Sequence, residues 1–239
     1  MNIADFIAGK VLLINKPYKW TSFDAVNKVK WIIRNNAKKN IPDGSDEKPP
    51  NLRVGHAGTL DPLATGLLII CTGKETKNIE RYQAAEKEYT GTFFIGATTP
   101  CYDLEKPVDK IFPTEHITEE MIRRGSKKFI GTQMQTPPIF SAVMIDGKRA
   151  YQIARAGKTA EIKSREITIH SFEIKRISIP EVDFKIVCSK GTYIRAIARD
   201  LGEELKSGAH LTALCRTRIG NFVLKDSVSL EDFEKENLV

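Results

Sequence analysis

Short apolar runs and alternating segments dominate the hydrophobic pattern of the chain, and both predict β-strands. The runs at 10–15 and 67–72 are short, continuous and bounded by turn residues, which is typical of buried strands. Residues 87–97 alternate instead, so every second side chain faces one side of a sheet. Further strands are predicted at 166–179, 182–188 and 211–220.

Helical periodicity lies between these strands. The longest helix is predicted at 21–35, where Thr21 and Asp24 match a capping box. Its basic side chains lie off the apolar face, so we expect most of them to be solvated. Shorter helices are predicted at 75–83, at 118–130 with Thr118 as its cap, at 149–157, and from Thr192 onward. This mixture predicts an α+β fold: one domain over 1–239, with a mixed, mostly antiparallel sheet flanked by helices.

A polar segment at 38–51 interrupts the pattern and is rich in proline, glycine and charged residues, so we expect an exposed loop there. No apolar stretch is long enough to cross a membrane, and the start of the chain lacks the features of a secretory signal. The 239 residues are 41% apolar and 28% charged, which suits a globular domain with a substantial core.

The charge and the cysteine content of the chain indicate which kind of partner and which cellular location to expect. Lysine and arginine number 37 against 30 aspartate and glutamate, and the excess lies in the body of the chain, so a polyanionic partner is favoured. The four cysteines have no Cys-x-x-Cys spacing, and the four histidines are scattered. We therefore expect no metal and a reducing, cytoplasmic location.

One loop gathers the residues best suited to chemistry. Residues 53–66 read RVGHAGTLDPLATG and hold three glycines, a histidine and one carboxylate, Asp61, directly before a predicted buried strand. A loop fixed to such a strand is where a scaffold usually presents chemistry. Asp61 followed by Pro62 is by itself a common type I turn, so the pair alone favours a structural interpretation.

The segment GHAGTLDPLATG resembles the signature of the TruB family of pseudouridine synthases, which isomerise the T-loop uridine of tRNA, conventionally position 55. Similar segments follow the family order: Lys16-Pro17, Lys87-x-Tyr89, 135–142, 188–202 and 211–220. The resemblance covers about residues 10–222. It implies the pseudouridine-synthase fold, an insertion at 38–51, no redox cofactor and no metal. It also leads us to expect no C-terminal RNA-binding PUA domain, for which no length remains.

The resemblance implies roles for six residues. Asp61 would be the catalytic residue, and Arg195 would pair with it, fix its orientation and favour its ionised form. Tyr89 would stack on the uracil and is a candidate for a later proton transfer. The other substrate-binding residues would be Tyr193 and Leu214, which line the pocket, and His56, which fills the space left by the flipped base.

RNA recognition would then rest on loop shape and phosphate contacts, for which the basic helix at 118–130 is a candidate. We expect a monomer that needs no protein partner and binds tRNA, not a membrane. The family commonly has an aspartate where this chain has Pro100, so no role of that aspartate is carried over, and Asp103 remains.

Several alternatives stay open. Read alone, Tyr89 is an ordinary core aromatic of a strand and Arg195 an ordinary surface arginine. A catalytically silent RNA-binding or tRNA-folding protein would share the scaffold, and so would a guide-directed modifier of the dyskerin type. A base-releasing glycosidase normally needs two carboxylates, and these motifs hold no second one.

Overall fold

The computed structural model describes residues 2–39, 50–158 and 160–238. It divides into two compact units, the first formed by 1–87 and 215–239 and the second by 88–214. The predicted organisation as one domain stays a prediction. Most of the predicted insertion at 38–51 lies outside the described residues. In the part of the chain that is described, no helix is long and apolar enough to cross a membrane.

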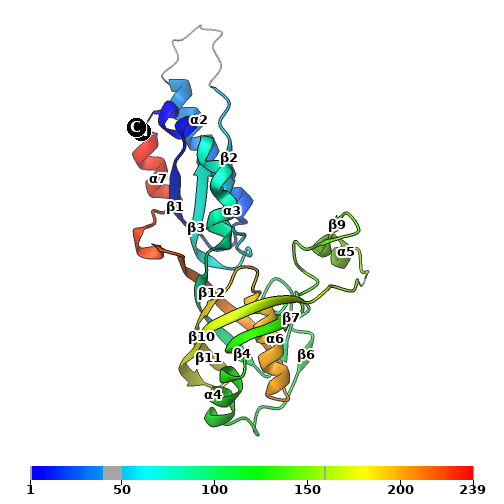
Figure 1. The fold of residues 1–239 in the computed structure, drawn as a ribbon. Helices are drawn as coiled ribbons and strands as arrows, with labels where there is room; N and C mark the ends of the chain where they lie inside the picture. The colour runs from blue at the N-terminus through cyan, green and yellow to red at the C-terminus, as the bar shows by residue number, and fades with distance from the viewer. Residues whose placement is uncertain (1, 40–49, 159, 239) are drawn as a thin grey trace. The chain divides into compact units, whose positions relative to one another are not determined.

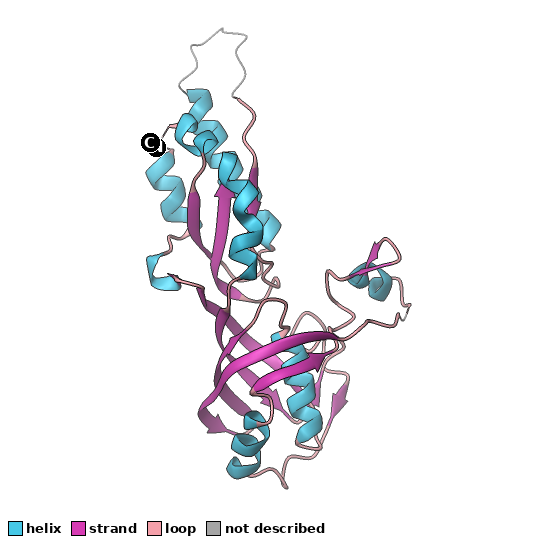
Figure 2. Ribbon diagram, in the orientation of Figure 1, coloured by secondary structure: helices cyan, strands magenta, loops and turns pink. Residues whose placement is uncertain are grey.

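The first unit contains a mixed sheet centred on β3 (Figures 1 and 2). Strands β1 and β2 pair with β3 in antiparallel orientation, and the C-terminal part of β12 pairs with it in parallel orientation. The strands of this unit are β1 (Val11–Lys16), β2 (Val54–His56), β3 (Thr65–Thr72), β13 (Phe222–Val223) and part of β12 (Ala209–Ile219). Its helices are α1 (Ile3–Ala8), α2 (Ser22–Lys39), η1 (Gly73–Asn78), α3 (Ile79–Ala84), η2 (Leu224–Asp226) and α7 (Leu230–Asn237).

Strand β3 is buried on both faces, which explains its uninterrupted apolar sequence. Leu68 and Ile70 point into one hydrophobic cluster, which also includes side chains of α1, α2 and α7. Leu67 and Ile69 point into a second cluster, against which Ile79 of α3 packs. The prediction of a buried strand after the signature loop is therefore confirmed, and the loop is attached to a rigid element.

Helix α2 begins as predicted and ends later than predicted. The N–H of Thr21 donates to the Asp24 carboxylate at 2.9 Å, and the N–H of Asp24 donates to the Thr21 hydroxyl at 3.0 Å, which confirms the capping box. The helix continues to Lys39, so Lys38 and Lys39 are helical and the prediction of a loop from residue 38 is wrong there. The buried Ala37 carries the apolar face through this last turn.

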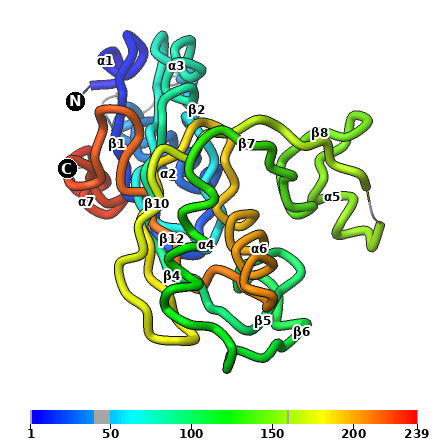
Figure 3. The backbone as a smooth tube through the Cα atoms, turned by 60° about the horizontal axis from the view of Figure 1, so that its bottom comes forward, coloured from blue at the N-terminus to red at the C-terminus, as the bar shows by residue number. Residues whose placement is uncertain are grey.

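The second unit is built on a sheet with the strand order β12-β4-β11-β10-β7, in which β10 pairs in antiparallel orientation with β11 and with β7. Its strands are β4 (Lys87–Ile95), β5 (Ala97–Thr98), β6 (Lys110–Ile111), β7 (Gly131–Gln135), β8 (Met144–Ile145), β9 (Lys148–Arg149), β10 (Arg165–Ser178), β11 (Glu181–Cys188) and the N-terminal part of β12. Its helices are α4 (Glu119–Lys127), α5 (Ala150–Arg155) and α6 (Ile194–Glu204). Figure 3 shows α4 and α6 side by side, and α4 also contacts β10.

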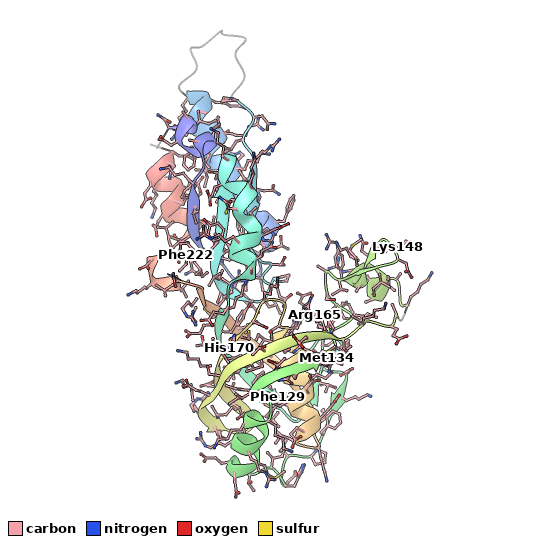
Figure 4. All side chains as sticks on the ribbon, viewed as in Figure 1. Phe129, Met134, Lys148, Arg165, His170 and Phe222 are labelled. Atoms are coloured by element: carbon pink, nitrogen blue, oxygen red, sulfur yellow. The ribbon has the colours of Figure 1, made fainter. Side chains whose placement is uncertain are left out.

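An aromatic cluster forms the core of this unit. The rings of Phe93 and Phe184 stack with centroids 4.0 Å apart, and Phe172 meets both rings edge-on. Phe129, which follows α4 and is labelled in Figure 4, packs on Phe172 with ring centroids 6.2 Å apart. These contacts join α4 to the strands, since the four rings come from different elements.

A hairpin with a helix extends from the sheet of the second unit. Asp146 and Gly147 have φ values of +47° and +79°, so the turn predicted between β8 and β9 is confirmed. Figure 4 places Lys148 on this hairpin, away from Met134 and Arg165 on the paired strands β7 and β10. Helix α5 follows the hairpin. The N-cap predicted for the separate helix α4 is also confirmed, because the Thr118 hydroxyl accepts from the Met121 N–H at 3.2 Å.

Candidate active site

The loop between β2 and β3 carries the candidate carboxylate on a tight turn. The carbonyl oxygen of Asp61 accepts a hydrogen bond from the N–H of Ala64 at 3.1 Å, and Pro62 occupies the second position, where its fixed φ is favoured. Gly66, the second residue of β3, has a φ of +103°. A Cβ at this position would lie 2.4 Å from the carbonyl oxygen of Arg216, so only glycine lets β3 approach β12 here.

A buried serine at the start of α2 fixes the residue before Asp61. Ser22 is 2% exposed, and its Oγ accepts from the N–H of Leu60 at 2.8 Å and donates to the Leu60 carbonyl oxygen at 3.3 Å. The start of α2 therefore holds the backbone on which Asp61 stands. The sequence gives no sign of this role, because Ser22 is 38 positions from Leu60.

A buried lysine lies beside the same turn. Lys16 is fully buried, and its ammonium donates to the carbonyl oxygens of Pro17 at 2.9 Å, Trp20 at 2.6 Å and Pro62 at 3.3 Å. Burial lowers the pKa of Lys16 from 10.5 to about 8, and the negative charge of Asp61 opposes that shift. The ammonium is thus charged at neutral pH and holds the carbonyl oxygen of Pro62, the residue after Asp61.

Arg216 supports the loop from β12. It is 1% exposed, and its guanidinium donates to the carbonyl oxygens of Leu67 at 2.9 Å, Gly58 at 3.0 Å and Thr59 at 3.4 Å. Its charge also contributes to the lowered pKa of Lys16. Two buried cations thus bind loop carbonyls and place fixed positive charge in the unit that carries Asp61. The family resemblance placed Lys16-Pro17 in a motif that shapes the floor of the site, but it did not predict the bonds of Lys16 to the loop. No role was predicted for Arg216, although a charged residue inside a strand-like segment was a usable signal.

His56 is the last residue of β2 and is partly buried. Burial lowers its pKa, the positive charge of Arg216 lowers it further, and the backbone of Gly58 acts in the opposite direction. The ring is therefore neutral at pH 7. Its Nδ1 is buried and has no hydrogen-bond partner among the described residues.

In the second unit, Arg195 is buried at the start of α6. Its Nη1 donates to the carbonyl oxygen of Cys101 at 3.2 Å and its Nη2 to that of Phe140 at 2.9 Å. Its Nε lies 3.6 Å from a carboxylate oxygen of Asp103, which is also buried. The alternative of a surface arginine is therefore wrong. Pairing of Arg195 with Asp61, which belongs to the first unit, stays a prediction.

Tyr193 is the N-cap of α6, so the prediction that Thr192 caps this helix is wrong. The Thr192 hydroxyl donates instead to the Ser189 carbonyl oxygen at 3.0 Å. Gln135 holds Tyr193 at both backbone groups, accepting from its N–H at 2.9 Å and donating to its carbonyl oxygen at 3.2 Å. The guanidinium of Arg165 lies over the Tyr193 ring at 4.6 Å. These two side chains, neither of them predicted, set the orientation of Tyr193.

Tyr89 and Leu214 lie on the neighbouring strands β4 and β12 of the second unit. Tyr89 is 8% exposed and shares the buried face of β4 with Phe93 and Ile95, as the alternation predicted. Leu214 is partly buried. The structure thus places Tyr89, Tyr193, Arg195 and Leu214 in one unit and Asp61 and His56 in the other.

The candidate phosphate-binding helix is α4, and some basic side chains of this segment already form ion pairs within the protein. Arg123 pairs with Glu119 at 2.7 Å, and Lys128, just after the helix, pairs with Glu204 at 2.6 Å. The two other basic residues of the helix form no ion pair with a described carboxylate. Over the same described residues, no three His, Cys, Asp or Glu side chains come together as a potential metal site.

Two family models together match most of the chain. The model described as TruB family pseudouridylate synthase (N terminal domain) matches residues 47–194. The model described as tRNA pseudouridylate synthase B C-terminal domain matches residues 195–239.

Two curated relatives agree with this chain over nearly all of their length. A protein of Flavobacterium johnsoniae named tRNA pseudouridine synthase B is 54% identical over 98% of this chain and 99% of its own. A protein of Phocaeicola vulgatus with the same name is 52% identical over 96% and 93%.

Among solved structures, a chain of "Crystal Structure of a Cbf5-Nop10-Gar1 Complex" aligns with a TM-score of 0.70 and 26% identity. The alignment covers 98% of this chain and 55% of that chain, so this chain spans about half the length of that one. The α+β fold with a mostly antiparallel sheet is confirmed, and so is the resemblance to the family. The chain belongs to the TruB family of pseudouridylate synthases.

Proposed function

We propose that the protein is a tRNA pseudouridine synthase that isomerises the T-loop uridine, conventionally position 55. The observation that carries the proposal is the full-length identity of 54% to a curated relative named tRNA pseudouridine synthase B. The signature loop with Asp61 agrees with it, since this loop is held from α2, β1 and β12 by the buried side chains of Ser22, Lys16 and Arg216.

The reaction is an isomerisation in which every atom of the uridine is kept. The bond from N1 of uracil to C1′ of ribose breaks, the base turns, a bond from C5 to C1′ forms, and the C5 proton moves to N1. We assign Asp61 the central role, because one fixed carboxylate can serve as nucleophile or as base. Attack on C1′, attack on C6 and removal of a ribose proton to give a glycal are all compatible with this geometry.

The substrate-binding roles follow from side-chain chemistry. Arg195 would pair with Asp61 when the substrate is bound, Tyr89 would stack on the uracil and take part in the proton transfer, and Tyr193 and Leu214 would line the pocket. The base must leave its stack, which costs a few kcal/mol. The planar and neutral ring of His56 suits the space that the base leaves, because an uncharged ring can lie against neighbouring bases.

We further propose that the protein acts on tRNA as a cytoplasmic monomer without a metal, a cofactor or a protein partner. The solved chain of the Cbf5-Nop10-Gar1 complex raises the alternative of a guide-directed modifier within a larger assembly. The curated relatives favour direct action on tRNA, because they match in length and carry the tRNA name, whereas that solved chain is nearly twice as long.

The test is incubation of the purified protein alone with an unmodified tRNA transcript, followed by chemical mapping of pseudouridine. A single new pseudouridine in the T-loop is expected, and a transcript with cytidine at that position serves as the control. Tight binding without any pseudouridine would favour a tRNA-folding protein instead. Pseudouridine elsewhere would keep the reaction and overturn the substrate position.

A further inference from the structure

One exposed face of α2 combines cations and aromatic rings in a way that the proposed reaction does not use. Residues at helical spacing share this face, which we call the α2 face: Phe23, Asn27, Lys30, Trp31, Arg34 and Lys38. Five of these six side chains are exposed, and Lys30 is partly buried. The buried apolar residues lie on the opposite side of the helix. A hollow of about 370 Å³ lies over the C-terminal two-thirds of the face.

The charge of the α2 face has one sign. The hollow is lined by Lys30, Arg34 and Lys38 together with asparagine and tryptophan side chains, and no acidic residue of the described part of the chain lines it. None of the three cations forms an ion pair with a carboxylate among the described residues. In contrast, Lys28 on the flank of the helix pairs with Glu234 of α7 at 2.7 Å. The three cations are therefore available to an anionic partner.

The aromatic residues favour a nucleic acid over a simple anion. Trp31 is 49% exposed and Phe23 is 66% exposed, although large apolar side chains are normally covered. The ammonium of Lys28 lies 4.6 Å from the Trp31 ring centroid, which holds the indole in place. Exposed rings among cations are typical of surfaces that stack on bases or ribose while the cations contact phosphates.

The α2 face also begins beside the loop that carries Asp61. Ser22, the first residue of α2, holds Leu60 through two hydrogen bonds, and Leu60 precedes Asp61. From Phe23 to Lys38 the helix rises by about 22 Å at ~1.5 Å per residue. An RNA whose target base reaches Asp61 thus has a cationic surface leading away from the site within the same unit.

We propose that the α2 face is an RNA-binding surface that holds the part of the tRNA next to the target loop. This inference rests on the proposed function for the identity of the RNA. Lys30, Arg34 and Lys38 contact phosphates, and Trp31 packs against a base or ribose. The surface adds affinity and orientation but takes no part in the bond rearrangement.

The test compares two triple variants of equal charge loss. The first is Lys30→Gln, Arg34→Gln and Lys38→Gln, and the control replaces the exposed Lys10, Lys225 and Lys235 of the same unit by glutamine. Glutamine keeps helix propensity close to that of lysine and arginine. The measured quantity is the Kd for an unmodified tRNA transcript over a series of salt concentrations.

The α2 variant should bind about 10- to 100-fold more weakly at ~0.1 M salt, and its plot of log K against log salt should be shallower by about 2–3. The control variant should stay close to the wild-type protein. Trp31→Ala should weaken binding by roughly 5- to 100-fold with an unchanged salt slope. The single-turnover rate at saturating tRNA should be unchanged in all of these variants.

Equal affinity and slope in the two triple variants would overturn the proposal. So would binding of the wild-type protein, but not the α2 variant, to vesicles of equal parts phosphatidylcholine and phosphatidylserine together with unaltered tRNA affinity, because the face would then bind membranes. Failure of the proposed function is distinguishable, since it would appear as wild-type protein that binds tRNA without forming pseudouridine.

Discussion

Replacing Lys16 by methionine tests how the loop that carries Asp61 is supported. The ammonium of Lys16 is fully buried and donates to the carbonyl oxygens of Pro17, Trp20 and Pro62. Methionine fills a similar volume but leaves these carbonyls without that donor, at roughly 1–3 kcal/mol for each group that stays buried and unsatisfied. We therefore expect a lower free energy of unfolding and slower pseudouridine formation.

The pH dependence of the free energy of unfolding gives a more quantitative test of Lys16 than the substitution at one pH. The pKa of Lys16 falls from 10.5 to about 8 on folding, mainly because of burial. Below pH 8 the lysine is charged in both states, and folding bears the cost of burying the charge. Between pH 8 and 10.5 the unfolded chain binds more protons, so wild-type stability rises with pH by up to about 3 kcal/mol at ~1.4 kcal/mol per pKa unit. Lys16→Met should not show this rise in stability, because methionine does not titrate.

The assay is urea unfolding of wild-type protein and Lys16→Met in parallel between about pH 7 and pH 10.5. Trp20 and Trp31 both lie in the first unit, so their fluorescence reports on the unit that contains Lys16. Subtracting the two free energies removes the titration of all other groups, and Lys10→Met is the exposed control. A difference that stays constant across this range would refute the assignment of Lys16 as a buried charge.

Three further substitutions probe the site. Ser22→Ala should cost about 1–3 kcal/mol of unfolding free energy and slow turnover, because the Leu60 N–H and carbonyl lose their partner; unchanged urea unfolding would contradict this. Gly66→Ala should lower the melting temperature sharply, since its Cβ meets the Arg216 backbone at 2.4 Å, and a wild-type melting curve would show that β3 and β12 are not so close. Arg195→Lys keeps the charge but loses the guanidinium fork, so turnover at saturating tRNA should fall by roughly 10- to 100-fold with little change in Kd; weaker binding with normal turnover would make Arg195 a phosphate contact.

The local backbone conformation of the loop that carries Asp61 could be predicted from the sequence. The apolar run after the signature loop, the glycines around it and the Asp61-Pro62 pair each constrain local conformation, and local conformation is what short patterns encode. The predicted strand β3, the turn at Asp61 and the capping box of α2 are accordingly present in the structure.

The supports of the site could not be predicted in this way. Lys16, Ser22 and Arg216 act on backbone carbonyls and N–H groups, which every residue possesses, so no pattern marks their partners in advance. The same holds for Gln135, whose amide holds the backbone of Tyr193 from 58 positions away. Such contacts join segments distant in sequence, and their geometry is set only when the sheet has formed.

The N-terminus of α6 shows a local error with a physical reason. Thr192 is a favoured helix cap, yet its hydroxyl bonds to Ser189 and the cap position falls on Tyr193. No described side chain makes a capping hydrogen bond at Tyr193, and the Gln135 amide instead binds both backbone groups of this residue. Here a tertiary contact overrides a local preference.

The catalytic role of Asp61 is tested by comparing Asp61→Asn with Asp103→Asn on an unmodified tRNA transcript. Both changes remove one carboxylate charge and keep the side-chain size, and Asp103 is the carboxylate that faces Arg195 within the second unit. We expect that Asp61→Asn forms no pseudouridine under single-turnover conditions while it binds tRNA nearly as tightly as the wild-type protein, and that Asp103→Asn still forms the product. Pseudouridine formed by Asp61→Asn at the wild-type rate would show that the Asp61 carboxylate is not the catalytic group.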